Sequence, residues 1–164
     1  MIIIEGIFIG IIATFLFDLF DFITQYAYGT NKKKWNIVGR YFAKLFFELK
    51  FFQENIHNEP VVKNENFIGY FFHYFIGSIF GIFFIFINYF YYSYSNIVGV
   101  ESYFISIFFG FFTVLFGWCF MQPYAYNIGF FASKEENQIE ILLQNFISHF
   151  MFGNGLFFGL ILLK

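Results

Sequence analysis

Four apolar stretches of about 20 residues, each nearly free of charge, constrain this chain more than any other feature. Each is close to the ~20 residues that a helix needs to cross ~30 Å of hydrocarbon. Only 12% of the residues are charged and the mean hydropathy is +0.65, whereas soluble domains carry about a quarter charged residues. We therefore expect an all-α fold, a transmembrane four-helix bundle that forms a single integral membrane domain over residues 1–164. The predicted spans run from about Ile2 to Thr24, Phe67 to Tyr89, Tyr103 to Met121 and Ile139 to Leu162.

The connections between these stretches differ in basic charge. The second connection, around Ser93 to Val100, has no Lys or Arg, and the third contains Lys134. The positive-inside rule then places the first and third connections in the cytoplasm and both termini outside. The N-terminal stretch lacks the basic start and the cleavage site of a signal peptide, so we expect it to be retained as the first span. The first connection contains seven basic residues: Lys32, Lys33, Lys34, Arg40, Lys44, Lys50 and Lys63.

Part of the first connection is too apolar for a linker. Residues 36–52 read NIVGRYFAKLFFELKFF, with Arg40, Lys44 and Glu48 recurring every four residues among apolar ones. This pattern predicts an interfacial amphipathic helix at about 36–52 on the cytoplasmic side, whose basic stripe faces anionic lipid. We expect Arg40 and Lys44 to contact lipid headgroups or a loop. After the third predicted span, Pro123 is expected to stop the helix.

Polar residues inside the spans are informative, because a charged side chain in hydrocarbon is costly unless it is paired or hydrated. The first span carries Asp18 and Asp21 one helical turn apart, on a face that continues the small residues Gly6, Gly10 and Thr14. Small residues allow close approach of a neighbouring helix. We expect the carboxylates to meet polar groups of that neighbour.

The second span has a matching stripe with His73 among glycines at spacings of four, namely Gly69, Gly77 and Gly81. Asp18 and His73 lie at similar distances from the cytoplasmic ends of their spans, so the two side chains are expected to meet at one depth. Gln122 at the end of the third span and His149 in the fourth belong to the same half of the bundle. The predicted intramembrane polar site consists of Asp18, Asp21, His73, Gln122 and His149.

Two interpretations of this set stay open. The polar residues either form interhelical hydrogen bonds that fix packing, or they form a functional site. A metal site made by His73, His149 and Asp18 is a weaker hypothesis, since no pair shows HxxxH or ExxH spacing. We expect no cofactor and no catalytic triad or phosphate loop. The net charge of −2 gives no reason to expect nucleic acid, and a lone Cys119 permits no intrachain disulfide.

Several ordered motifs resemble a group of small bacterial inner-membrane proteins that are catalogued as a domain of unknown function with four predicted spans. The resemblance covers nearly the whole chain and implies a four-pass fold and an inner-membrane location, but no activity. The motifs are GIIATFLFDLF (Gly10 to Phe20), VGRYF (Val38 to Phe42), EPVVKNENFIGYFFHYFIG (Glu59 to Gly77), FGFFTVLF with MQP (Phe109 to Pro123) and HFMFGNGL (His149 to Leu156).

The resemblance also singles out individual positions. The chain departs from the family pattern at Gln53, where a His is expected, and at Tyr124, where a Gly is usual. Each departure weakens the view that the loops bind a metal or turn sharply. The positions implied by the resemblance are Asp18, Arg40, Pro60, Glu65, His73, Gln122, Pro123, Ser133 and His149.

Three functional classes are compatible with the sequence. The favoured one is transport or ion and proton handling through the Asp/His site, opening to the cytoplasm. A homo-oligomer is compatible with it, because one four-helix protomer is small for a complete pathway. The first alternative is a structural or partner-binding membrane subunit whose polar residues only fix packing, and the second is a metal- or haem-binding membrane enzyme. The lipid bilayer is the one partner that the sequence itself predicts.

Overall fold

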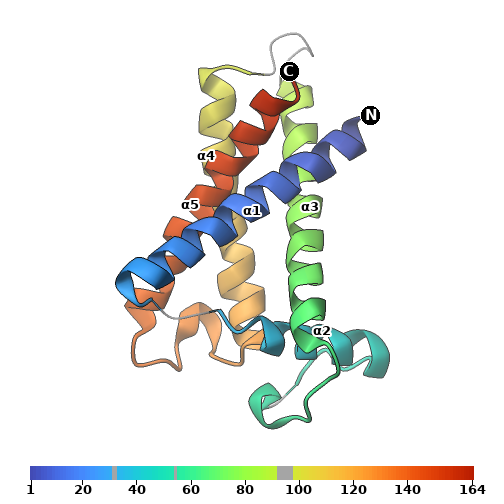
Figure 1. Cartoon of the computed structure of the whole chain (residues 1–164), viewed down its shortest axis with the longest axis vertical. Helices are drawn as coiled ribbons and strands as arrows, with labels where there is room; N and C mark the ends of the chain where they lie inside the picture. The colour runs from blue at the N-terminus through green and yellow to red at the C-terminus, as the bar shows by residue number, and fades with distance from the viewer. Residues whose placement is uncertain (31–32, 54, 92–97) are drawn as a thin grey trace. The chain divides into compact units, whose positions relative to one another are not determined.

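A computed structural model describes residues 1–30, 33–53, 55–91 and 98–164, and their regular structure is helical throughout. Figure 1 shows the long helices with the short helix α2. The predicted connection around Ser93 lies mostly outside the described residues. The elements are α1 (Ile2–Tyr28), α2 (Trp35–Glu48), the 3₁₀ turn η1 (Ile56–Asn58), α3 (Glu65–Tyr91), α4 (Val100–Phe116), the π-helix η3 (Gly117–Ala125), the 3₁₀ turn η4 (Phe130–Ala132) and α5 (Gln138–Leu162).

The prediction of four membrane-spanning helices is confirmed in number and position. Among the residues that the structure describes, four helical segments are long and apolar enough to cross a membrane: Ile2–Tyr28, Glu65–Tyr91, Val100–Ala125 and Gln138–Leu162. Each contains its predicted span, with a few extra residues at one or both ends. The fold class is therefore all-α, as a four-helix membrane bundle requires.

The described residues group into two compact units. Unit 1 comprises Met1–Asn31, Tyr74–Val114 and Phe146–Lys164, and unit 2 comprises Lys32–His73 and Leu115–Asn145. The long helices α3 and α5 contribute residues to both. The expectation of one integral membrane domain stays a prediction.

Close contacts between helices in unit 1 occur where glycines replace larger side chains. A Cβ on Gly10 would lie 2.3 Å from the carbonyl oxygen of Gly77, and one on Gly81 would lie 2.2 Å from that of Gly6. The predicted small-residue stripes of the first and second spans therefore do meet, at the crossing of α1 and α3. Helix α1 also packs on α5, where a Cβ on Gly155 would lie 2.5 Å from the Ala13 Cα.

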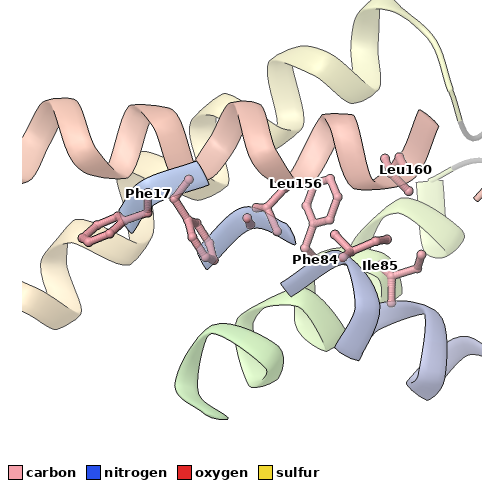
Figure 2. Close-up of a cluster of buried hydrophobic side chains, with 8 residues drawn as sticks. Phe17, Phe84, Ile85, Leu156 and Leu160 are labelled. Carbon is pink, nitrogen blue, oxygen red and sulfur yellow. The ribbon is translucent and has the colours of Figure 1, made fainter. Parts of the chain in front are cut away.

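The core of unit 1 is a cluster of apolar side chains between α1, α3 and α5. Figure 2 shows Phe17 from α1, Phe84 and Ile85 from α3, and Leu156 and Leu160 from α5 around this cluster. Both chain ends lie at the same end of the unit (Figure 1), as an even number of crossings requires. This packing aligns the polar residues of α1 and α5 that follow.

Two local predictions in unit 2 are wrong. The amphipathic helix ends at Glu48 rather than near residue 52, because Leu49 takes a left-handed conformation with φ 55° and closes the helix. Pro123 does not stop the third helix: it lies inside η3, which continues to Ala125. The hydrogen bond from the Tyr126 nitrogen to the Met121 carbonyl, 2.9 Å long, spans five residues. Such a wide π turn relieves the clash that a proline ring makes in an α-helix.

Candidate functional site

A carboxylate and a hydroxyl join α1 to α5 in unit 1. The Ser148 hydroxyl donates a hydrogen bond of 2.5 Å to the Asp21 carboxylate. Ser148 is fully buried, while Asp21 is partly buried. A hydrogen bond to an ionised acceptor is stronger than one between neutral groups, so this contact both fixes the helix pair and stabilises a carboxylate within an apolar segment.

The next residue of α5, His149, contacts a third helix. Its Nδ1 lies 2.8 Å from the Thr113 hydroxyl of α4, and that hydroxyl donates to the Gly110 carbonyl at 2.7 Å. A hydroxyl has one proton to donate. Because the carbonyl can only accept, the Thr113 proton lies toward Gly110 and Nδ1 donates to the hydroxyl oxygen. In the neutral imidazole, Nε2 is then the atom that can take up a proton.

Aromatic rings surround this imidazole. The Phe17 ring of α1 meets it edge-on at a centroid distance of 5.3 Å, and the Phe152 ring lies at 6.4 Å. His149 is half-buried, and these two rings cover part of its imidazole. A titratable group in such a setting interacts strongly with nearby charge. The set formed by Asp21, Ser148, His149 and Thr113 is called the three-helix polar set below.

The five residues of the predicted polar site are divided between the units. Asp18, Asp21 and His149 belong to unit 1, and His73 and Gln122 belong to unit 2. Asp18 is half-buried on α1, one turn before Asp21, and takes part in interactions. The predicted meeting of Asp18 with His73 stays a prediction.

In unit 2, His73 lies against an aromatic side chain of α2. Its ring stacks on the indole of Trp35, with centroids 4.1 Å apart and planes inclined by 30°. Trp35 also contacts Tyr70, one turn earlier on α3. This stacking holds the imidazole ring in place against α2.

Gln122 lies in η3 and is 3% exposed. Within the described part of the chain, neither its side-chain oxygen nor its nitrogen has a hydrogen-bond partner, and the same holds for the Tyr41 hydroxyl and the Gln53 Oε1. Burial raises the pKa of Tyr41 above its ordinary value, which keeps the phenol neutral. Buried polar atoms without partners are rare in proteins and call for an explanation.

An asparagine that sequence reasoning missed holds the backbone beside these groups. The Asn127 amide nitrogen donates to the carbonyls of Gln53 and Pro123, and its oxygen accepts from the Asn55 nitrogen at 2.9 Å. These bonds connect the loop after α2 to the loop after η3. The only available signal was an Asn two residues before a Gly, a pair that often marks a turn.

His57, in the loop between α2 and α3, is exposed but also bonded. Its Nε2 lies 2.8 Å from the Tyr126 carbonyl. Since a carbonyl only accepts, Nε2 carries the proton. This bond adds a second link between the same two loops.

The basic residues of α2 do not form the lipid-facing stripe that the sequence predicted. Arg40 and Lys44 are 4% and 7% exposed, so neither faces the headgroup plane. Arg40 makes a two-pronged ion pair with Glu65 of α3, at 2.9 and 3.1 Å, and Lys44 pairs with Glu59 at 2.5 Å. Of the two contacts expected for these residues, lipid headgroup or loop, the structure shows loop contacts.

Arg40 also organises the loop that precedes α3. One of its guanidinium nitrogens, Nη1, donates to the carbonyls of Ile56, His57 and Glu59 at 3.2, 3.4 and 2.9 Å. Five hydrogen bonds therefore converge on one side chain. Arg40 and Glu65 are two of the positions that the resemblance singled out, and their roles here are structural.

Metal binding finds no support in the residues placed by the structure: within 1–30, 33–53, 55–91 and 98–164, no three His, Cys, Asp or Glu side chains form a group that could hold an ion.

A family model described as "Protein of unknown function (DUF2938)" matches residues 7–163, which is nearly the whole chain. Comparison with the curated proteins and with the solved structures gave no match.

Proposed function

We propose that this chain, which belongs to the DUF2938 family, handles protons or a small cation in the membrane through the three-helix polar set. The observation that carries the proposal is that two adjacent residues of α5 bond to two other helices: Ser148 donates to the Asp21 carboxylate of α1, and the His149 imidazole bonds to Thr113 of α4. A carboxylate such as that of Asp21 can bind a proton or a cation, and an imidazole such as that of His149 can accept and donate a proton.

The distribution of charge supports an orientation for this activity. Eight of the nine basic residues lie in unit 2, and unit 1 contains only Lys164. By the positive-inside rule, we propose that the two connections that carry these basic residues face the cytoplasm and that both termini face outward. The polar set would then open toward the cytoplasm. A bacterial inner membrane, a homo-oligomeric pathway and the identity of the solute belong to the same proposal.

A packing role is the second candidate, and the glycine contacts favour it. The close approach of α1 and α3 at Gly10 and Gly81 shows that helix packing in this unit is tight, and interhelical hydrogen bonds of about 1 kcal/mol each are a general means of fixing such packing. Under this alternative, the polar set fixes helix register and has no role in flux.

Isosteric substitutions separate the two roles. Asp21→Asn keeps an oxygen that accepts from Ser148, and His149→Asn keeps a donor near the Nδ1 position, but neither side chain titrates. The full-length protein and each variant are reconstituted into liposomes that contain a pH-sensitive dye, and internal pH is followed after a proton gradient is applied. Proton handling predicts loss of most of the flux in both variants with little change in melting temperature.

The complementary variants remove hydrogen bonds but keep the titratable groups. Ser148→Ala and Thr113→Val should lower the melting temperature while retaining flux. Ser78→Ala is the matched control, because the Ser78 hydroxyl bonds only to the Tyr74 carbonyl of its own helix among the bonds resolved here. If the unaltered protein gives no flux above empty liposomes, or if the two Asn variants conduct normally, the proposal fails and the packing role stands.

A further inference from the structure

A strongly apolar surface lies outside the four spans, at the end of α2 and in the residues that follow. Five large apolar side chains between residues 46 and 52 are exposed, and three of them, Phe47, Leu49 and Phe52, are more than 70% exposed. Contiguous exposed apolar surface of this kind marks an interaction site. We call it the 46–52 face: Phe46, Phe47, Leu49, Phe51 and Phe52.

The charges within this face cancel. Glu48 pairs with Lys50 at 2.8 Å and with Lys44 at 3.8 Å. The neighbouring Lys44 is buried and paired with Glu59 as well. The face therefore offers aromatic and aliphatic surface without unpaired positive charge, so anionic headgroups have little to attract them here.

Its location follows from the contacts of α2 with the first turns of α3. A Cβ on Gly39 would lie 1.7 Å from the Glu65 carbonyl, so the two backbones nearly touch. Further along α2, the rings of Phe42 and Phe46 stack on Phe72 of α3, at 4.3 and 5.2 Å. Helix α2 thus packs on the end of a helix that is apolar enough to span a membrane, which is where the bilayer boundary lies.

We propose that the 46–52 face inserts into the boundary between headgroups and acyl chains, as an apolar anchor that does not depend on anionic lipid. The occupant is the lipid bilayer itself. On the turns of α3 against which α2 packs, Phe67 and Phe71 are also exposed, by 72% and 54%, and the Phe71 ring contacts Phe72, on which Phe46 stacks. Aromatic side chains are favoured at this depth. The inference reverses the sequence prediction: α2 meets the membrane through its rings, with its basic residues turned inward.

Depth-dependent fluorescence quenching tests this directly. The full-length protein carries Cys119→Ser and one new cysteine, Phe47→Cys, labelled with an environment-sensitive NBD dye. It is reconstituted in phosphatidylcholine vesicles, with and without phosphatidylglycerol. Asn58→Cys, in the exposed polar loop of the same unit, is the matched control, and Phe52→Cys provides a second site if the first variant does not fold.

The proposal predicts that dye at position 47 is quenched by lipid carrying a doxyl group and protected from aqueous iodide, equally in both lipid mixtures. Dye at position 58 should show the opposite pattern. Quenching by iodide at position 47 would place the face in water and overturn the proposal. Dependence of doxyl quenching on phosphatidylglycerol would overturn its apolar character, and disulfide formation between copies at position 47, with protection from both quenchers, would make a second copy the occupant.

Discussion

The ion pair between Arg40 and Glu65 provides the sharpest test of how unit 2 is held together. The two side chains are 5% and 11% exposed. Removing one partner of a buried pair leaves an uncompensated charge and costs about 3–5 kcal/mol. We therefore expect Arg40→Met to lower the free energy of unfolding by this amount. It removes the cation that pairs with Glu65, which keeps only its bonds from Asn36 and the Val62 nitrogen, and it removes the donor to the carbonyls of Ile56, His57 and Glu59.

A second substitution separates the two contributions. Adding Glu65→Gln to Arg40→Met removes the buried charge, so part of the lost stability should return, on the order of 1–3 kcal/mol. The remaining deficit measures the orphaned loop carbonyls. If Glu65 were an ordinary surface residue, adding Glu65→Gln would not restore stability.

Both tryptophans, Trp35 and Trp118, belong to unit 2, so intrinsic fluorescence reports its unfolding in mixed micelles. Lys63→Met, at an exposed position, controls for loss of a positive charge. The reasoning is refuted if Arg40→Met costs no more than this control, or if the added Glu65→Gln lowers stability further.

Three other predictions follow from single residues. Gln122→Met should raise the melting temperature, because it removes two buried polar atoms for which the described residues supply no partner; a clear decrease would mean that the amide is satisfied. Gly81→Ala should cost about 1–3 kcal/mol through backbone overlap, while Gly99→Ala, with open space around it, should be neutral; equal effects in thermal unfolding would contradict the close approach. The pKa of the Glu48 carboxyl lies below its ordinary value because Lys50 donates a hydrogen bond to it. The small contribution of this ion pair to stability is therefore present at neutral pH and is lost as pH falls through the lowered pKa. An NMR titration that gives an ordinary pKa for Glu48 would contradict the ion pair with Lys50.

The long helices were predictable from sequence because bilayer thickness sets their length and hydrocarbon excludes charge. The glycine stripes were predictable for a related reason. Gly10 and Gly81 each belong to a series of residues spaced by four, one on α1 and one on α3. At these two positions only a residue without a side chain allows the contact that the helices make. Asp21 and His149 were identified by the cost of placing them in lipid, and each has the kind of partner on a neighbouring helix that this cost demands.

The partners themselves could not be read from the sequence. Thr113 is one of several hydroxyl residues in its span, whereas Ser148 is the only one in the fourth span, and periodicity does not tell which polar group of a neighbouring helix either of them meets. Asn127 lies in an irregular loop, where no repeating pattern constrains side-chain direction. The continuation of the helix through Pro123 depends on a π turn, which has no local sequence signature.

The most instructive error concerns α2. The spacing of its basic residues was interpreted correctly, but the direction in which that basic face points was not. A spacing of four places Arg40 and Lys44 on one face, but the pattern is the same whether that face points inward or outward. In water, apolar residues turn inward and the ambiguity vanishes. At a membrane boundary, exposed rings have lipid to contact while buried cations have Glu65 and Glu59, so charge complementarity decides the direction. The acidic residues that follow in the chain, rather than α2 itself, therefore determine which face of the helix is buried. An amphipathic segment next to a membrane span should be interpreted together with the charges of the residues that follow it.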